Sequence, residues 1–457
     1  MSEQQDLSLR FAENMVKLGK SRLAPADLEQ VRRLLLDLLG VSLCGSQLPW
    51  TLALRDWATP FRGSGVAPVV GAGFTVAPSV AALVNSTAAH GYELDDTHDA
   101  SMSHPGAVVI PTALAVAAGT HVDEIAVCAA IAAGYETMAR VGMAANASRV
   151  VAAGFHPTSL FGSFGAATAA ALLQGLDAPA LARAWGHALS LTGGSMQFSD
   201  EPAGTMVKRL HAGYAAQNGI LAAGMAKRGV SAPSRALDGK YGLLALYTRE
   251  PRPQLFDVDP RAPLQIHQIS MKPYSCCRLF HSLIDALDEA TEGFREPAAG
   301  IRHILVRGPG VIFDQHMLRR PTSVMAAQYS LPYVVGATLA VGPHRFDAYR
   351  DEHLGNEEIL ALADKVEGQQ DLEIEAEYPE HMGAAVELTM ADGSVRSAKV
   401  MDSRGTSAHP LTTDAIRAKA TNLARDAAPQ FDMTAACRTI WQAPAADCQA
   451  LVQLFAG

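Results

Sequence analysis

Charged residues and cysteines are both scarce in this 457-residue chain. Asp, Glu, Lys and Arg together supply 18% of the residues, and the formal net charge is −9. No block of Lys and Arg with interleaved aromatic residues is present, so we expect no nucleic-acid partner. The six cysteines form no Cys-x-x-Cys pair and have no spacing suited to zinc, which predicts reduced thiols.

Targeting and membrane signals are also lacking. The first ten residues, MSEQQDLSLR, contain no basic stretch followed by an apolar one, as a secretory signal would. The most apolar segment, Ile125 to Ala147, is interrupted by Glu136, Arg140 and Asn146, so we expect no bilayer span. The sequence therefore predicts a cytoplasmic protein with no membrane partner.

Hydrophobic residues, at 49% of the chain, supply enough apolar surface for a compact globular protein. A length of 457 residues exceeds what one ordinary core supports, so we expect two domains. Apolar residues recur at spacings of three and four up to about residue 250, which is typical of helices. The predicted helices cover 24–43, 77–90, 106–118, 122–143, 158–174, 178–192 and 209–228.

The pattern changes after a proline-rich connector at 251–263. Strands are predicted at 302–308 and 372–378, a helix at 325–339, and a hairpin at 385–400 around Asp392-Gly393. Helices return at 411–425, 433–441 and 444–455. We therefore predict a mainly α fold, with a large helical domain formed by 1–265 and 405–457 and a smaller α+β domain formed by 266–404.

The segment from His90 to Pro111 concentrates four acidic residues and three histidines between two apolar, helical stretches. Charge placed between core helices is costly unless it has a use, and histidine exchanges protons near neutral pH. The spacing of Asp95, Asp96 and Asp99 also matches the D-D-x-x-D pattern by which all-α prenyl-diphosphate enzymes hold magnesium. We find no second acidic cluster on a comparable helix, so we predict no metal. A solvated acidic loop is the remaining alternative.

Three further segments carry candidate ligands for an anion. His156 precedes Pro157 at the predicted start of a helix, where backbone N–H groups favour negative charge. Lys208 and Lys272 lie among small or apolar residues, and lysine is seldom buried without a partner. Taken singly, each residue has another explanation. The histidine can form structural hydrogen bonds, and each lysine can extend its charged end into solvent.

Together the four segments resemble the MmgE/PrpD family, which includes 2-methylcitrate dehydratase, cis-aconitate decarboxylase and iminodisuccinate epimerase. The resemblance rests on NSTAAHGYELDDT with HPG (85–106), GFHPT (154–158), KRLHAGYAAQNG (208–219) and KPYSC (272–276). It implies a large helical domain with a smaller α+β lid, a homodimer, and activity without metal or organic cofactor. The site residues that it implies are Glu93, Asp96, Thr97, His104, His156, Lys208 and Lys272.

The chain departs from the family pattern in two places. Glu93 stands where the decarboxylase and methylcitrate branches usually have aspartate, and the loop from Thr97 to His104 is one residue longer than in the decarboxylase. Both departures bear on the geometry of the substrate.

The implied site suits proton transfer next to a carboxylate. Lys208, Lys272 and His156 would bind a small polycarboxylate and stabilise the charge that develops when a C–H bond breaks. His104 would move the proton, with Asp96, Glu93 and Thr97 as its catalytic partners. We predict a cofactor-independent lyase, foremost a dehydratase of a hydroxy di- or tricarboxylate. An epimerase of an imino- or amino-dicarboxylate, a cis-aconitate-type decarboxylase and a non-catalytic binding homologue are the alternatives.

Overall fold

The computed structural model describes residues 6–201, 205–293, 300–442 and 447–456. The chain divides into two compact units. The first contains residues 1–198, 206–270 and 412–457, and the second contains 199–205 and 271–411. The sequence placed the two boundaries at 265/266 and 404/405, and it assigned the short segment 199–205 to the helical domain.

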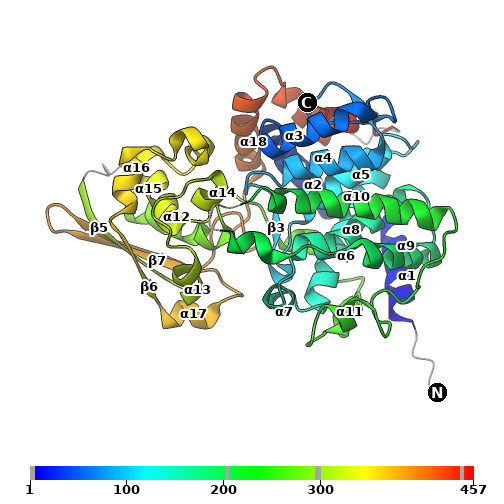
Figure 1. Ribbon diagram of the computed structural model, residues 1–457, viewed down its shortest axis with the longest axis horizontal. Coiled ribbons are helices and arrows are strands. Elements are labelled where there is room, and N and C mark those ends of the chain that lie inside the picture. Colours follow the sequence, from blue (N-terminus) through cyan, green and yellow to red (C-terminus); the bar gives the residue numbers. More distant parts are fainter. Residues whose placement is uncertain (1–5, 202–204, 294–299, 443–446, 457) are drawn as a thin grey trace. The chain divides into compact units, whose positions relative to one another are not determined.

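Helices make up most of the first unit, where the strands are only two residues long (Figure 1). The helices are α1 (Leu7–Lys20), α2 (Pro25–Gly45), α3 (Pro49–Ala58), α4 (Pro78–Ala89), α5 (Pro105–Ala117), α6 (Glu124–Ala144), α7 (Ala147–Ala152), α8 (Pro157–Leu173), α9 (Ala178–Leu191), α10 (Val207–Lys227), α11 (Leu243–Leu246), α18 (Thr413–Ala427), α19 (Met433–Trp441) and α20 (Gln449–Leu454). Two antiparallel pairs join β1 (Ala67–Pro68) to β2 (Thr75–Val76) and β3 (Thr97–His98) to β4 (Ile269–Ser270).

The seven helices predicted before residue 250 all form, and their ends lie within two residues of the predicted ones. Local chemistry accounts for this agreement. Proline occupies the first turn of α2, α4, α5, α8 and α9, where its missing N–H costs no hydrogen bond. Asp123 and Asp177 cap α6 and α9 with their side chains. Of the helix predicted at 444–455 only 449–454 form as α20; residues 447 and 448 are not helical, and 443–446 lie outside the described part.

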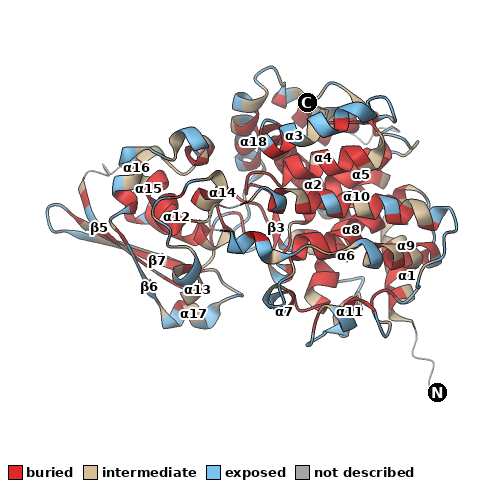
Figure 2. Ribbon diagram, viewed as in Figure 1, coloured by how far each residue is buried: buried red, intermediate tan, exposed pale blue. Residues whose placement is uncertain are grey.

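Small residues let the central helices approach one another closely. A Cβ atom added to Gly213 of α10 would lie 2.5 Å from the carbonyl oxygen of Leu83 in α4, and one on Gly165 of α8 would lie 2.8 Å from that of Gly134 in α6. These helices are buried along most of their length (Figure 2). Helix α6 alone among the described helices is long and apolar enough to cross a membrane, but 89% of it is buried inside the protein, as in a core helix.

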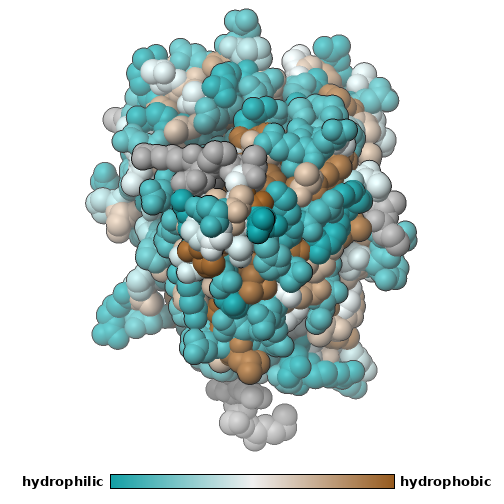
Figure 3. All heavy atoms as spheres, turned by 90° about the vertical axis from the view of Figure 1, so that its left-hand side faces the viewer, coloured by the Kyte–Doolittle hydropathy of each residue, from teal (hydrophilic) through white to brown (hydrophobic). Residues whose placement is uncertain are grey.

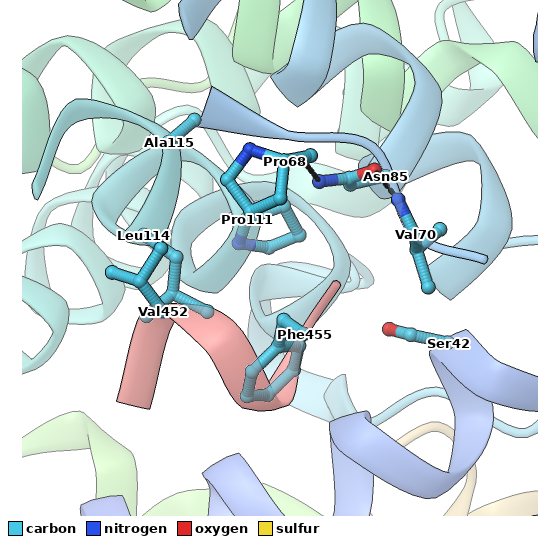
Figure 4. A pocket seen from close by; sticks show the side chains of 9 residues that line it. All are labelled: Ser42, Pro68, Val70, Asn85, Pro111, Leu114, Ala115, Val452 and Phe455. Atoms are coloured by element: carbon cyan, nitrogen blue, oxygen red, sulfur yellow. Dashed lines mark hydrogen bonds between the residues drawn. The ribbon is translucent and has the colours of Figure 1, made fainter. Parts of the chain in front are cut away.

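The C-terminal helix α20 packs in the first unit near residues 85–111, the segment that contains the acidic motif. Val452 and Phe455 close a cavity of about 10 Å³ that is also lined by Pro111 and Asn85 (Figure 4). The Asn85 side chain donates to the carbonyl oxygen of Pro68 and accepts from the backbone N–H of Val70, each at 2.9 Å. Asn85 therefore anchors the chain that precedes α4. The space suffices for one water molecule, not for a substrate.

The second unit combines a four-stranded sheet with short helices. Its strands are β5 (Ile301–Gly308), β6 (Val366–Gln370), β7 (Ala384–Met390) and β8 (Val395–Val400), in the order β6-β5-β7-β8, with β5 and β6 parallel. Its helices are α12 (His281–Ala290), α13 (Gly310–Gln315), α14 (Val324–Gln328), α15 (Leu331–Val341), α16 (Glu357–Ala363) and α17 (Leu372–Glu377). Buried residues alternate along β7, which packs against α12. The predicted mainly α fold with a smaller mixed unit is confirmed.

The predicted hairpin is confirmed, because β7 and β8 pair antiparallel and Gly393 adopts a φ of 88° in the turn. The strand predicted at 372–378 is wrong, since α17 forms there. Asp371 caps this helix by accepting from the N–H groups of Glu373 and Ile374, and Leu, Glu and Ala are good helix formers. The true strand is β6, which ends two residues earlier.

The helix predicted at 325–339 is in fact two helices, α14 and α15. The break falls at Tyr329 and Ser330, where the Ser330 side chain caps α15 and Pro332 lies in its first turn.

Figure 3 shows one face of the molecule on which hydrophilic residues predominate, with small hydrophobic groups between them.

Candidate active site

Asp95 joins two histidines from the ends of two helices. His90, the last residue before the loop that follows α4, places its Nδ1 atom 2.7 Å from Asp95 Oδ2. His104, which precedes α5, places its Nδ1 atom 3.1 Å from the same oxygen, a distance for an ion pair although the angle is not that of a hydrogen bond. Their ring centroids lie 4.7 Å apart. Because its Nδ1 faces Asp95, the Nε2 atom of His104 points away from that carboxylate.

The same three side chains offer donor atoms within 4.8 Å of one another, which a metal ion could use. Their contacts fit a hydrogen-bonded cluster better. The 2.7 Å contact between His90 and Asp95 is normal for an N–H group that donates to a carboxylate. A metal-bound histidine usually donates its other ring N–H to a partner, but Nε2 of His90 has no hydrogen-bond partner among the described residues.

Asp96 lies in a different environment from Asp95. Its carboxylate accepts from the Tyr135 hydroxyl at 2.7 Å and from the backbone N–H of Gly106 at 2.8 Å, so it caps the first turn of α5. A Cβ atom on Gly106 would lie 2.6 Å from Asp96 Oδ1, which explains why glycine follows Pro105 here. The Asp96 carboxylate thus binds to the scaffold, and no contact joins it to His104.

Thr97 begins β3 and pairs with Ser270 of β4. Its hydroxyl donates to Asp99 Oδ1 at 2.8 Å, and Asp99 Oδ2 accepts from the Ser270 hydroxyl at 2.8 Å. These contacts fix the strand that follows the acidic loop.

Glu93 binds two cations from α10. Lys208 and Arg209 both donate to its Oε1 atom, Arg209 at 2.5 Å. All three side chains are buried, with exposed fractions of 1% to 4%. The Arg209 guanidinium also lies over the Trp50 ring, 5.6 Å from its centroid. Glu93 has a φ of 54°, a left-handed conformation that is uncommon for a residue other than glycine.

His156 lies at the start of α8, close to the start of α5 and to His211 of α10. The backbone N–H of His104 donates to the hydroxyl of Thr158 in α8 at 3.2 Å, which ties the start of α5 to that of α8. His156 Nδ1 lies 2.9 Å from Nδ1 of His211, which belongs to the start of α10. The starts of α5 and α8 therefore lie together with His211 of α10 beside them, and the dipoles of α5 and α8 favour an anion there.

Lys272, the seventh predicted residue, belongs to the second unit and is 2% exposed. The backbone N–H of its neighbour Met271 donates to the carbonyl oxygen of Gly405 at 2.8 Å within that unit. The first unit contains the other six predicted residues. Among them His104 and His156 both lie near the His90 ring, at centroid distances of 4.7 and 6.1 Å, and Lys208 pairs with Glu93.

Comparison with known proteins agrees with the sequence motifs. The MmgE/PrpD N-terminal domain matches residues 10–255, and the MmgE/PrpD C-terminal domain matches residues 274–442. The chain belongs to the MmgE/PrpD family. The two matched domains correspond broadly to the helical unit and the mixed unit of the fold.

The relatives found in this family include several decarboxylases. The chain is 28% identical to the cis-aconitate decarboxylase-like protein oryM of Aspergillus oryzae, over 88% of this chain and 87% of the relative. It is 28% identical to the cis-aconitate decarboxylase of Aspergillus terreus, over 81% and 80%, and 25% identical to that of Mus musculus, over 90% and 85%. These names describe lyases.

Burial and charge control the protonation of this MmgE/PrpD site. Burial by itself raises the pKa of Asp95, but the His104 and His90 rings outweigh it and hold that pKa well below its usual range. Burial raises the pKa of Asp96 to about 7, because its two hydrogen bonds offset only part of the desolvation. Burial, with nearby Lys208, lowers the pKa of His211 to about 4 and that of His156 well below its ordinary value.

The sequence prediction omitted several residues that contact the predicted ones. They include His90, Asp95, Arg209 and His211. Arg209 and His211 fall one and three places after Lys208 in the KRLH motif, so helical spacing could have suggested that His211 shares a face with Lys208. No local signal distinguishes Asp95 from Asp96.

Proposed function

We propose that this MmgE/PrpD protein is a lyase that works without metal or organic cofactor and moves a proton at a carbon next to a carboxylate of a small polycarboxylate. The observation that carries the proposal is the contact between Nδ1 of His104 and the buried Asp95 carboxylate, at 3.1 Å, beside helix starts that favour an anion. His104 is the residue that transfers the proton.

Asp95 gives His104 the properties of a proton-transfer residue. A buried carboxylate next to Nδ1 orients the ring and stabilises the imidazolium that forms when Nε2 takes up a proton. Asp95 stays ionised, because its two histidine neighbours lower its pKa. Asp96, which we predicted as a partner of His104, supports α5 instead, so we assign it a structural part in this mechanism.

Lys208, His156 and the starts of α8 and α10 are the carboxylate-binding groups in this proposal. A cation and backbone N–H groups at a helix start form charge-assisted hydrogen bonds to a carboxylate. The same groups stabilise the charge that develops on it as the neighbouring bond breaks. The expectation that Lys272 binds the substrate stays a prediction, because this lysine belongs to the second unit.

Decarboxylation is the first candidate reaction, because the relatives over most of the chain are named as cis-aconitate decarboxylases. In that reaction the bond between carbon and the leaving carboxylate breaks and releases carbon dioxide. Its electron pair stays on the substrate carbon skeleton, and protonated His104 delivers a proton there. The sequence alone favoured dehydration instead.

Dehydration remains the second candidate, and Glu93 is the observation that favours it. Glu93 already binds Lys208 and Arg209, so one carboxylate position near these cations is filled by the protein itself. A hydroxy-dicarboxylate would suit such a site better than a tricarboxylate. His104 would then remove a proton from carbon, the electron pair would form the double bond, and hydroxide would leave with a proton as water.

A panel assay separates these candidates. We expect purified protein to release carbon dioxide from cis-aconitate, or to generate the ultraviolet absorbance of an unsaturated acid from hydroxy di- or tricarboxylates. Deuterium uptake from solvent without net conversion would assign an epimerase instead. Activity that EDTA abolishes and a divalent metal restores would assign the cluster of His90, Asp95 and His104 to a metal. Absence of all three activities would overturn the proposal.

We also propose that the protein is a homodimer that uses the outer face of α10. Val207, Tyr214 and Leu221 recur every seven residues on this helix and are 41%, 39% and 41% exposed. Such a stripe suits packing against a helix of a second copy. Leu221→Arg should shift the mass measured by light scattering from dimer to monomer. Leu246→Arg, at another exposed leucine (55%), should leave the mass unchanged.

A further inference from the structure

His156 and His211 form a histidine pair in the interior of the first unit. Their Nδ1 atoms lie 2.9 Å apart, and the residues are only 6% and 4% exposed. The Phe198 ring stands nearly perpendicular to both imidazoles, with centroid distances of 5.5 Å to each. The Phe198 ring, together with α8 and α10, restricts the rotation of both imidazole rings.

A contact between two Nδ1 atoms constrains where the protons are. It is a hydrogen bond only if one ring carries a proton on Nδ1 and the other does not. Two imidazolium rings would oppose two donors, and Lys208 nearby makes that state worse. Burial lowers the pKa of both rings, so both are neutral at physiological pH. The two histidines must therefore adopt complementary tautomers.

The direction of the hydrogen bond decides what His156 presents through Nε2. If His156 donates from Nδ1, its Nε2 carries a lone pair, which repels a carboxylate. If His211 donates, Nε2 of His156 carries the proton and can donate to a carboxylate. His156 occupies the N-cap position of α8 without a side-chain capping bond, and an anion is favoured there, so the second arrangement matches the carboxylate-binding part of the proposed function.

We propose that His211 is a positioning residue that donates its Nδ1–H to Nδ1 of His156 and thereby keeps the proton of His156 on Nε2, where it binds a substrate carboxylate. This inference rests on the proposed function for the identity of the ligand. The tautomers of the pair are a property of the free protein and can be measured without any ligand.

The first test is nitrogen-15 NMR of protein labelled at its histidines, with signals assigned from the variants His156→Asn and His211→Asn. At pH 7.5 we expect His211 to show a protonated Nδ1 and His156 to show a protonated Nε2 and a bare Nδ1. A proton on Nδ1 of His156, or a doubly protonated ring in either residue, would overturn the proposal.

The second test compares two variants in binding of tricarballylate, a saturated tricarboxylate with no double bond or hydroxyl to react. His211→Leu removes the donor at similar size, and we expect the Kd from calorimetry to rise about 10-fold, as for the loss of one hydrogen bond to the ligand. His211→Asn places an amide N–H near the former Nδ1, and we expect it to restore binding to within about threefold of the wild type.

His187→Leu is the matched control, because this histidine lies on α9 and contacts the carbonyl oxygen of Val230 at 3.1 Å. It should bind tricarballylate like the wild type. If His211→Leu, folded as judged by its melting temperature, also binds normally, His211 has no positioning role. If the wild type itself does not bind tricarballylate, the tricarboxylate substrate in the proposed function loses its support, while the NMR result still decides the tautomers.

Discussion

Asp95 and Asp96 are neighbours in the sequence, but their pKa values are shifted in opposite directions. Asp95 lies between two histidine rings, and its pKa is held well below the usual range, whereas the pKa of Asp96 is raised to about 7. Asp95 therefore remains a carboxylate that can pair with an imidazolium. Asp96 is held by Tyr135 and Gly106, which do not supply a positive charge. Asp95 lies in a bend and Asp96 directly precedes β3, and the two carboxyls contact different neighbours.

His104→Ala tests the proton-transfer assignment. We expect kcat to fall by about 10²- to 10⁴-fold, the usual contribution of a positioned acid or base, because no other ring replaces the Nε2 atom. The control is His121→Ala, at an exposed histidine, which should keep full activity. A His104→Ala protein that is folded and as active as the control would show that His104 is not the residue that transfers the proton.

Glu93→Asp tests how the glutamate affects the choice of substrate. The variant keeps the negative charge for Lys208 and Arg209 but is one methylene shorter, which gives the site more room. We expect kcat/KM for cis-aconitate to rise relative to that for hydroxy-dicarboxylates by about 10-fold, the scale of one methylene in a fitted site. An unchanged ratio would mean that Glu93 does not select the substrate.

At the scale of elements, a helix near the C-terminus supports the loop that carries Glu93 and Asp95. Lys419 of α18 donates to Asp37 of α2 and to the carbonyl oxygen of Leu94, each at 2.8 Å. Leu94 lies between Glu93 and Asp95, so this lysine fixes the backbone on which both carboxylates are mounted. No local pattern in the sequence indicates this contact, since 325 residues separate Lys419 from Leu94.

Lys419→Met is expected to destabilise the fold by about 3 to 5 kcal/mol, because it leaves Asp37 buried without its cation. Arg417→Met on the same helix removes an exposed pair with Asp414 and should cost less than about 1 kcal/mol. Urea unfolding measures both variants. In the double variant Asp37→Leu with Lys419→Met most of the lost stability should return, and a double variant no more stable than Lys419→Met would contradict this account.

At the scale of the whole molecule, buried histidines make stability depend on pH. The pKa values of His90 and His211 are lowered to about 4, so unfolding between about pH 6.5 and pH 4 takes up protons. Stability therefore falls on acidification through this range, by up to about 3 kcal/mol for each histidine. Asp96 acts in the opposite direction, because its raised pKa gives the folded state a proton that unfolding releases.

Asp96→Asn separates these two effects. The variant lacks the carboxyl that gains stability as the pH falls, so its free energy of unfolding should decrease more steeply than that of the wild type between pH 7 and pH 4. Urea titrations at a series of pH values measure the two slopes. Equal slopes would show that Asp96 keeps an ordinary pKa in the folded protein.

The sequence by itself determined most helices of the first unit, the hairpin of the second and the family, although it did not predict the bounds of α1, α3, α7 and α11. Each of these depends on local information, such as the spacing of apolar residues, Pro157 at a helix start, or Asp392-Gly393 in a turn. The segment between Leu372 and Glu377 shows the limit of such information. Its alternating pattern predicts a strand, but a helix capped by Asp371 forms instead.

Only the tertiary structure decided which side chains meet. It paired His104 with Asp95 rather than with Asp96, joined Glu93 to Arg209, placed His211 against His156 and brought Lys419 beneath the loop. These residues come from helix ends and loops that are far apart in the chain, and their contacts depend on how the helices pack. Local periodicity carries no record of that packing, because it fixes the direction of a face and not the neighbour that covers it.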